Sequence, residues 1–266
     1  MIRSSKLADE TREAGPVECW CLHGAVGMAA DWREISKLLA AAKTSCRAID
    51  LWRFLEPTGI TMTDFGRALN AEADQPGFRG TGRVLVGYSM GGRLALQALL
   101  AERAPWSAAV IVSAHPGLSD EPERRQRAAA DKDWAAKAML GDWKSFLSEW
   151  GNQPVLGGDL PRDPATLAAM VSRRREIARS FVDWSLGAQE PLWERLEQIR
   201  IPLLWIAGEA DSKFLELARL AVERIPKARL AIAPGAGHRV PWDAPGWFSN
   251  EVASFCRTGG ENHPNP

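Results

Sequence analysis

Short apolar runs alternate with longer stretches of helical periodicity along most of this chain. Continuous apolar runs bounded by glycine, proline or polar turns are typical of strands buried on both faces, as in a parallel sheet. We therefore predict a mostly parallel sheet from these runs. They are Val17–Leu22, Cys46–Leu51, Arg83–Tyr88, Ala108–Ser113, Pro202–Ala207 and Leu230–Ala233.

Helical patterns fill the intervals between the predicted strands, and strand–helix alternation indicates a doubly wound α/β fold. These helices are expected at Ala29–Ala42, Thr63–Glu72, Met90–Arg103, Ser212–Ile225 and Trp247–Cys256. The alternation stops after the fourth predicted strand, where only helical segments follow: Glu121–Met139, Asp142–Trp150, Pro164–Ser180 and Pro191–Gln198. An all-helical insertion at this point predicts a cap over the carboxyl ends of the strands.

The same patterns divide the chain into parts. We predict a core from residues 1–116 and 200–258 and a helical cap from residues 117–199. The short polar segment at 259–266 is predicted to be a flexible tail. No run of 18 apolar residues predicts a membrane-spanning helix. The N-terminus lacks the apolar segment of a signal peptide. We expect a cytoplasmic protein without a membrane partner.

Charge and cysteine content narrow the function classes. The 33 Lys and Arg residues balance 33 Asp and Glu residues, which disfavours a nucleic-acid-binding surface but leaves a local basic pocket open. Cys19 and Cys21 are two positions apart in a predicted strand, so their side chains share one face. That spacing fits neither a CxxC redox pair nor a common zinc site. We expect reduced, buried thiols and no metal site.

A nucleophile-elbow motif is the sharpest chemical signal. Gly87-Tyr88-Ser89-Met90-Gly91 matches G-x-S-x-G, with a predicted strand before it and a predicted helix after it. The glycines allow a tight turn that lifts the Ser89 hydroxyl above the sheet. The alternative is a tight turn carrying a surface serine. The backbone N–H of Met90 is expected to point into the same space as Ser89.

A base and an acid follow in the order expected of an α/β-hydrolase triad. His238 comes just beyond the last predicted strand, and Asp211 comes beyond the strand before it. Glu209 is a weaker substitute for the acid. Asp211 also precedes a helical pattern, so a role as helix N-cap is an alternative or an addition. Among the other histidines, His23 is expected to be structural.

Two further groups are expected near Ser89. The loop after the first strand contains His23-Gly24, and its next N–H, that of Ala25, is the expected second oxyanion donor beside Met90. Arg93 follows the elbow, and Arg124 and Arg127 share one face of the first cap helix. Arginine forks bind carboxylates, although the cap arginines taken alone are better explained as a solvated helix face paired with Glu121 and Glu123.

The motifs, in this order, resemble one subgroup of α/β-hydrolases: the 2-succinyl-6-hydroxy-2,4-cyclohexadiene-1-carboxylate synthases of menaquinone biosynthesis, the MenH family. They cover about residues 17–250. The motifs are LHG at Leu22–Gly24, VGYSMGGR at Val86–Arg93, SAHPGL at Ser113–Leu118, ERRQR and DKDW within Glu123–Trp134, FLSEW at Phe146–Trp150, GEADSKF at Gly208–Phe214 and GAGH at Gly235–His238.

The resemblance implies an α/β-hydrolase fold and a lyase. Such an enzyme eliminates pyruvate from 2-succinyl-5-enolpyruvyl-6-hydroxy-3-cyclohexene-1-carboxylate, with the serine acting as a base. It needs no cofactor, and its partner is a small polycarboxylate. By motif position, the implied catalytic residues are Ser89, Asp211 and His238, and the implied substrate-binding residues are Arg93, Arg124, Arg127, Trp150 and Tyr88.

Two alternatives to the lyase stay open. A serine hydrolase, either an esterase or a C–C bond hydrolase, would use Ser89 covalently through an acyl-enzyme. A catalytically silent binding protein is disfavoured by the complete set of serine, acid and histidine. The arginines favour the lyase, because an esterase for neutral substrates gains little from burying guanidinium groups.

The chain also departs from the family pattern. LWRFLEPTGIT after Asp50 lacks the usual P-G-x-G-x-S, and Ala25 stands where many relatives have an aromatic residue. Both loops border the expected pocket. The exact substrate, like the oligomeric state, is therefore left open.

Overall fold

A six-stranded, fully parallel sheet forms the centre of the part of the chain that the structure describes, with strand order β2-β1-β3-β4-β5-β6. The computed structural model describes residues 17–75, 82–158 and 160–259. The chain passes from β1 out to β2 and returns to β3 on the other side of β1. The carboxyl ends of β1 and β3 therefore flank a topological switch point, where open α/β sheets bind ligands. The strands are β1 (Val17–Leu22), β2 (Ser45–Ile49), β3 (Gly82–Tyr88), β4 (Ala108–Val112), β5 (Leu203–Gly208) and β6 (Ala228–Ala233).

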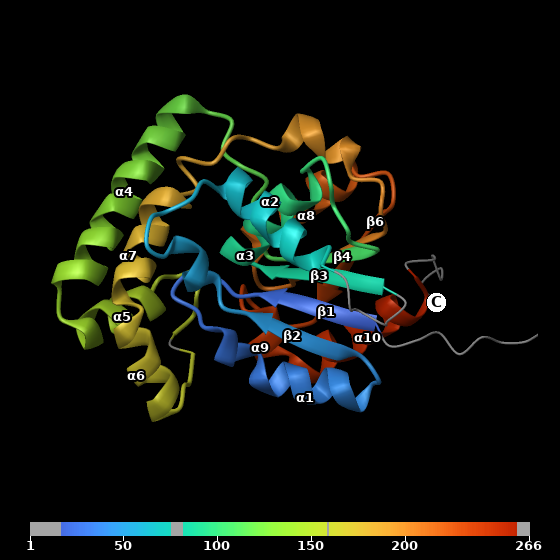
Figure 1. Cartoon of the computed structure of the whole chain (residues 1–266), viewed down its shortest axis with the longest axis horizontal. Helices are drawn as coiled ribbons and strands as arrows, with labels where there is room; N and C mark the ends of the chain where they lie inside the picture. The colour runs from blue at the N-terminus through green and yellow to red at the C-terminus, as the bar shows by residue number, and fades with distance from the viewer. Residues whose placement is uncertain (1–16, 76–81, 159, 260–266) are drawn as a thin grey trace, which may run out of the picture.

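Helices cover both faces of the sheet, as expected of a doubly wound fold (Figure 1). One face is covered by α1 (Arg33–Ala41) and α10 (Pro245–Arg257), and the other by α2 (Met62–Ala73), α3 (Met90–Leu99) and α8 (Ser212–Val222). Short turns of helix, η1 (Ala29–Trp32), η2 (Leu51–Leu55) and α9 (Val240–Asp243), lie in the connecting loops.

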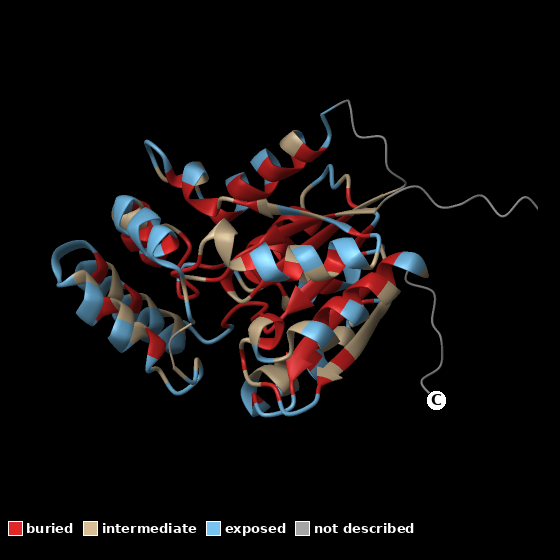
Figure 2. Cartoon of the chain, turned by 90° about the horizontal axis from the view of Figure 1, so that it is seen from below, coloured by how far each residue is buried: buried red, intermediate tan, exposed pale blue. Residues whose placement is uncertain are grey.

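Only helices are found among the described residues between β4 and β5, and they gather beyond the carboxyl ends of the strands (Figure 1). They are α4 (Glu121–Leu140), α5 (Trp143–Gly151), α6 (Pro164–Ser172), α7 (Arg174–Asp183) and η3 (Trp193–Gln198). We call residues 117–199 the cap. Its outer helices are largely exposed, while the central strands of the sheet are largely buried (Figure 2). The exact core–cap boundaries stay a prediction. The predicted tail lies, apart from Gly259, outside the described residues.

Side chains alternate between the two faces of the central strands. Trp20 and Leu22 pack into one core cluster, and Cys19 and Cys21 pack into the other. The shared face of the two cysteines is therefore as predicted. The thiol of Cys21 lies 3.4 Å from that of Cys46, and the thiol of Cys19 lies 3.8 Å from that of Cys256; all are free. These thiols fill space between the sheet and its helices.

The helix after the elbow is shorter than predicted, because it ends at Leu99 rather than Arg103. The physical reason is Asn70 of α2. Its side-chain amide donates to the carbonyl oxygens of Ala98 and Arg103, at 2.8 and 2.7 Å, and so satisfies carbonyls that a longer helix would use itself. Pro105 follows closely and disfavours helix before it.

A second difference lies in the cap. The predicted helix Pro164–Ser180 is two helices, α6 and α7, which meet at Arg173, whose ψ of 10° leaves the helical range. The Arg173 guanidinium turns to the core and pairs with Asp50 at 2.9 Å, and also with Glu56. Arg174 instead donates to carbonyl oxygens at the end of α4. These divergent partners account for the break.

Candidate active site

Ser89 stands on a strained turn between β3 and α3. Its φ of 52° is in the left-handed region, which a side chain with a Cβ rarely adopts, and such strain clusters at functional sites. A Cβ on Gly87 would overlap the backbone of Gly91, and one on Gly91 would overlap the carbonyl of Leu22. Glycine is therefore required at both positions for α3 to start this close to β1.

Three residues from separate loops form a hydrogen-bonded relay at the carboxyl edge of the sheet. His238 Nε2 lies 3.1 Å from Ser89 Oγ, and His238 Nδ1 lies 2.7 Å from Asp211 Oδ2. The histidine and the aspartate are buried. Phe214 of α8 packs on the imidazole at 4.4 Å between ring centroids. The sequence-predicted triad residues thus meet, in an arrangement suited to activating a serine hydroxyl.

Asp211 has two roles in the structure. One carboxylate oxygen contacts His238, and the other accepts from the Phe214 N–H at 3.5 Å as the N-cap of α8. The N-cap role, weighed as an alternative to the triad role, therefore coexists with it. Glu209 points elsewhere: it is exposed, and its carboxylate accepts from the Gly235 N–H at 2.8 Å.

The predicted oxyanion donors lie on both sides of Ser89. Met90 is the first residue of α3, and the first N–H groups of a helix have no acceptor within it. Ala25 follows β1 directly across the switch point, and no protein acceptor for its N–H is found in the described segments. Both N–H groups are available for a developing negative charge.

His23 is structural, as expected. Its ring is buried, Nε2 accepts from the Leu51 N–H at 3.3 Å, and Nδ1 lies 2.9 Å from the carbonyl oxygen of Gly24. The neutral tautomer with a proton on Nδ1 satisfies both contacts. Burial lowers the pKa of His23, which keeps the ring neutral and fixes the oxyanion loop to the segment after β2.

A small cavity of about 50 Å³ opens beside Ser89. Residues 24–27 form its floor together with Tyr88, whose ring packs on Trp242 at 4.8 Å. The cap contributes Trp150 and Arg162, and the loop after β6 contributes Arg239. Of the sequence-predicted site residues, Ala25, Tyr88, Ser89 and Trp150 therefore share this cavity.

Comparisons with known proteins agree with this geometry. The family model for the alpha/beta hydrolase family matches residues 21–251. The chain belongs to the alpha/beta hydrolase family. The 2-succinyl-6-hydroxy-2,4-cyclohexadiene-1-carboxylate synthase of Serratia proteamaculans (strain 568) is 30% identical over 256 residues, 95% of this chain and 97% of that protein. The match with that synthase extends along nearly the whole of both chains.

Two further similarities point to the same group. A Bacillus subtilis (strain 168) protein, whose name gives this synthase activity as provisional, is 33% identical over 177 residues, 64% of each chain. The solved structure of MenH from S. aureus has a TM-score of 0.75 and 22% identity, and the match covers 94% of this chain and 97% of that one. At this identity the solved structure supports the fold, and the resemblance of this α/β-hydrolase to MenH synthases rests on the sequence matches.

Arg93 is buried between α3 and the cap of this α/β-hydrolase. Its guanidinium donates to the Trp184 carbonyl at 2.8 Å and to Gln189 Oε1 at 3.0 Å, and both are neutral acceptors. Burial, with the charge of Arg127 adding to it, lowers the pKa of Arg93 to about 9. At neutral pH the group is still cationic, so it offers a positive charge without a paired carboxylate.

The other predicted arginines engage partners within the cap. Arg127 Nε donates to Asp131 at 2.8 Å, and 42% of the Arg127 side chain is exposed. Arg124 contacts Glu121 at 3.4 Å and the Gly187 carbonyl at 3.3 Å. Arg93, Arg124 and Arg127 do not line the cavity beside Ser89. Their role in substrate binding stays a prediction.

Sequence reasoning missed Arg162 and Arg239, which do line that cavity. Arg239 had a local signal, because it directly follows the triad histidine. Arg162 had none: it lies in an irregular cap loop, and its partner Asp31 is 131 positions away. The Arg162–Asp31 contact is formed only when the cap folds onto the loop after β1.

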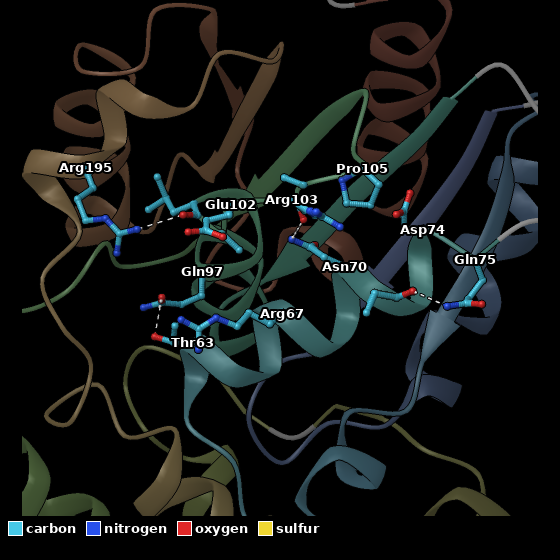
Figure 3. Close-up of a pocket in the computed structure, with 14 residues that line it drawn as sticks. Thr63, Arg67, Asn70, Asp74, Gln75, Gln97, Glu102, Arg103, Pro105 and Arg195 are labelled. Atoms are coloured by element: carbon cyan, nitrogen blue, oxygen red, sulfur yellow. Dashed lines mark hydrogen bonds between the residues drawn. The ribbon is translucent and has the colours of Figure 1, made fainter.

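A larger hollow, of about 1030 Å³, lies between α2 and the segment after α3 (Figure 3). It mixes charges of both signs, such as Arg67 and Glu102, on an open surface. Its central polar residue, Asn70, is already occupied by the carbonyl oxygens of Ala98 and Arg103. Since this hollow lies at the end of α3 away from Ser89, it is not part of the candidate active site.

Two searches were confined to residues 17–75, 82–158 and 160–259. Over these ranges no group of three or more His, Cys, Asp or Glu side chains is placed to hold a metal ion. None of the helices there has the length and apolar character needed to cross a membrane.

Proposed function

We propose that this chain is a 2-succinyl-6-hydroxy-2,4-cyclohexadiene-1-carboxylate synthase, a carbon–oxygen lyase of menaquinone biosynthesis. The observation that carries the proposal is the near full-length match, at 30% identity, to a synthase of that name. The hydrogen-bonded Ser89, His238 and Asp211 and the nearby cationic groups support it. The substrate is a small polycarboxylate, and the location is the cytoplasm.

The proposed reaction begins with a proton relay. His238 accepts the hydroxyl proton of Ser89, and the serine oxygen takes a proton from the substrate ring. The electron pair of that C–H bond forms a ring double bond at C2–C3, the existing double bond moves from C3–C4 to C4–C5, and the C–O bond from C5 to the enolpyruvyl group breaks. The departing enolate takes the proton that His238 holds and leaves as pyruvate. Asp211 orients the imidazole and stabilises its charged form.

Negative charge builds up on the substrate during proton removal. In the proposal this charge is delocalised onto the ketone oxygen of the succinyl group, which meets the N–H groups of Ala25 and Met90. Donors aimed in advance at such a charge typically account for a large share of catalysis. The same donors serve an acyl-transfer enzyme, so the chemical outcome depends on the substrate that the arginines admit.

The cationic groups support a substrate with several carboxylates. Arg93 is buried against neutral acceptors only, and isolated buried charges are unfavourable unless a counterion binds. Arg127 is close enough to lower the pKa of Arg93 and is expected to share the same anion. Trp150, at the cavity wall, offers an aromatic face for the ring.

The decisive assay measures pyruvate released from the enolpyruvyl substrate, with simple p-nitrophenyl esters assayed alongside. The lyase predicts pyruvate release that is much faster than ester cleavage and no accumulation of an acyl-enzyme. A serine hydrolase predicts the reverse, with a covalent adduct on Ser89 visible by mass spectrometry. Absence of pyruvate release from the wild-type protein would refute the proposal.

A further inference from the structure

Arg239 occupies an unusual position for a cation. It follows His238 directly and lines the same cavity as Ser89. Its side chain is partly buried and donates to the carbonyl oxygen of Gly158 in the cap. Burial raises the pKa of the neighbouring Tyr88 phenol, and the charge and hydrogen bond of Arg239 oppose that rise. The guanidinium therefore reaches across the cavity from the catalytic loop to the cap.

The second arginine of this cavity differs in one decisive respect. Arg162 is paired with Asp31 through two contacts, at 2.8 and 2.7 Å, and donates to the Val26 carbonyl at 3.1 Å. The Arg162 and Asp31 side chains are 13% and 3% exposed, so the pair is buried and neutralised. Asp31 is also the acidic residue that the cavity lining contributes. Its charge is already matched by Arg162.

Arg239 has no such counterion. Within the described ranges its partners are a carbonyl oxygen and a phenol, and no ion pair includes it. Among the described residues the wall of the cavity thus carries two guanidinium groups and one carboxylate, which leaves one positive charge unmatched beside Ser89. The volume of about 50 Å³ is enough for one carboxylate group.

We propose that Arg239 binds a carboxylate of the substrate in the cavity beside Ser89, separately from the site at Arg93. The assignment rests on the proposed function for the identity of the substrate, and on the unmatched charge for the anion. The fork of Arg239 holds one carboxylate next to the triad histidine, while Arg93 meets another beneath the cap. Arg239 is thereby a specificity-determining residue for polycarboxylates.

The kinetic test uses Arg239→Gln, which removes the charge but keeps a donor for Gly158, and Arg239→Lys, which keeps the charge. For the enolpyruvyl substrate, Arg239→Gln should raise KM by about 10- to 100-fold, as expected for the loss of a charge-assisted hydrogen bond, with a much smaller change in kcat. Arg239→Lys should recover part of the loss. Cleavage of a neutral p-nitrophenyl ester should be unchanged in both variants.

A matched control is Arg224→Gln. Arg224 donates to the Leu220 carbonyl at 2.8 Å, beyond the end of α8 opposite the triad. This variant should have the kcat and KM of the wild type. A fall in kcat/KM for the ester as large as for the tricarboxylate would overturn the proposal, because it would show that Arg239 only positions His238.

A second arm separates this proposal from the proposed function. Phenylmethanesulfonyl fluoride, a neutral reagent, labels an activated serine, and the labelling rate of Ser89 is measured with and without succinate. Succinate should protect the wild type and Arg239→Lys but not Arg239→Gln, while the neutral isostere succinamide should protect none. Equal protection by succinate in Arg239→Gln and the wild type would refute carboxylate binding by Arg239, whether or not the wild type releases pyruvate.

Discussion

The catalytic edge of the sheet and the helical cap are held in place by different forces. The relay residues follow the carboxyl ends of β3, β5 and β6, and the oxyanion loop is fixed by contacts of the buried His23 ring to the main chain. The cap packs its inner side chains into the same apolar cluster as the core, and arginine pairs join it to the core as well: Arg162 pairs with Asp31, and Arg173 pairs with Asp50.

This difference explains how one fold can keep its catalytic residues while the substrate that it binds changes. Hydrophobic packing fixes the serine, the base and the oxyanion donors, so they tolerate little displacement. Polar contacts between the cap and the core depend on a few side chains and can break without unfolding the sheet.

The largest effect on turnover is expected when a residue of the hydrogen-bonded relay is replaced. Ser89→Ala and His238→Ala should each lower kcat by about 10³- to 10⁶-fold, the scale seen when a member of a triad is removed. Pyruvate release measured for purified, folded variants tests this. The double variant should be little worse than either single one, because the two groups act as a unit. Near-normal turnover in either single variant would exclude that residue from catalysis.

The next largest effect is expected on stability, when an ion pair between the cap and the core is removed. Arg162→Ala should lower the free energy of unfolding by about 3–5 kcal/mol, because it leaves the buried Asp31 without its partner. Urea unfolding followed by tryptophan fluorescence measures this. Arg33→Ala is the control, since Arg33 is exposed and its pair with Asp163 should contribute at most about 1 kcal/mol. Equal effects would mean that the cap is not held by Arg162.

The junction of core and cap should respond to pH. Burial, aided by the charges of Lys213 and Arg93, lowers the pKa of His115 to about 4, below the value of about 6.5 expected in the unfolded chain. Between these values the unfolded chain binds more protons. The free energy of unfolding should therefore fall as the pH falls from about 6.5 to about 4, by up to about 3 kcal/mol.

The variant His115→Asn tests this assignment. An Asn oxygen can still accept from the Gly117 N–H, which His115 Nδ1 now accepts at 2.9 Å, but it does not titrate. Denaturant unfolding at pH 7 and pH 4.5 should show a shallower pH dependence than in the wild type. His23, whose pKa is also lowered by burial, should retain the rest of the dependence. An unchanged slope would rule out His115 as its source.

The smallest effect is expected for a cap residue that only recognises substrate. Arg127→Ala should raise KM for the tricarboxylate by about tenfold, as expected for the loss of about 1.4 kcal/mol of binding. The fold should survive with some loss of stability, because the buried Asp131 loses its ion partner but keeps its hydrogen bond from Ser185 at 2.7 Å. An equal loss with a neutral p-nitrophenyl ester would remove the recognition role of Arg127 and leave it a structural part of the cap.

Much of the core was predictable from the sequence, because its signals are local. Val17–Leu22 is a strand with the predicted bounds, and the elbow at Ser89 has the predicted strand before it and helix after it. A buried parallel strand needs a continuous apolar run, and a tight turn needs glycines. The order of Ser89, Asp211 and His238 was sufficient to predict which loops meet.

The cap was harder to predict because its signals depend on distant partners. The break at Arg173 depends on Asp50, and the place of Arg162 depends on Asp31; neither pairing leaves a periodic pattern in the chain. The predicted arginines Arg124 and Arg127 lie on one helix as expected, but their side chains meet cap residues rather than the cavity beside Ser89. Periodicity places a side chain on a helix face and does not give its partner.

The carboxylate of Asp211 connects local folding to chemistry. One of its oxygens caps the N-terminus of α8, and the other fixes the tautomer of the His238 imidazole. A single substitution at Asp211 therefore disturbs both contacts. Asparagine could keep only one of these contacts, because its amide nitrogen is a donor and cannot accept from the Phe214 N–H or from His238 Nδ1. The start of α8 and the hydrogen bond to His238 therefore depend on the same carboxylate, and a change at Asp211 affects both.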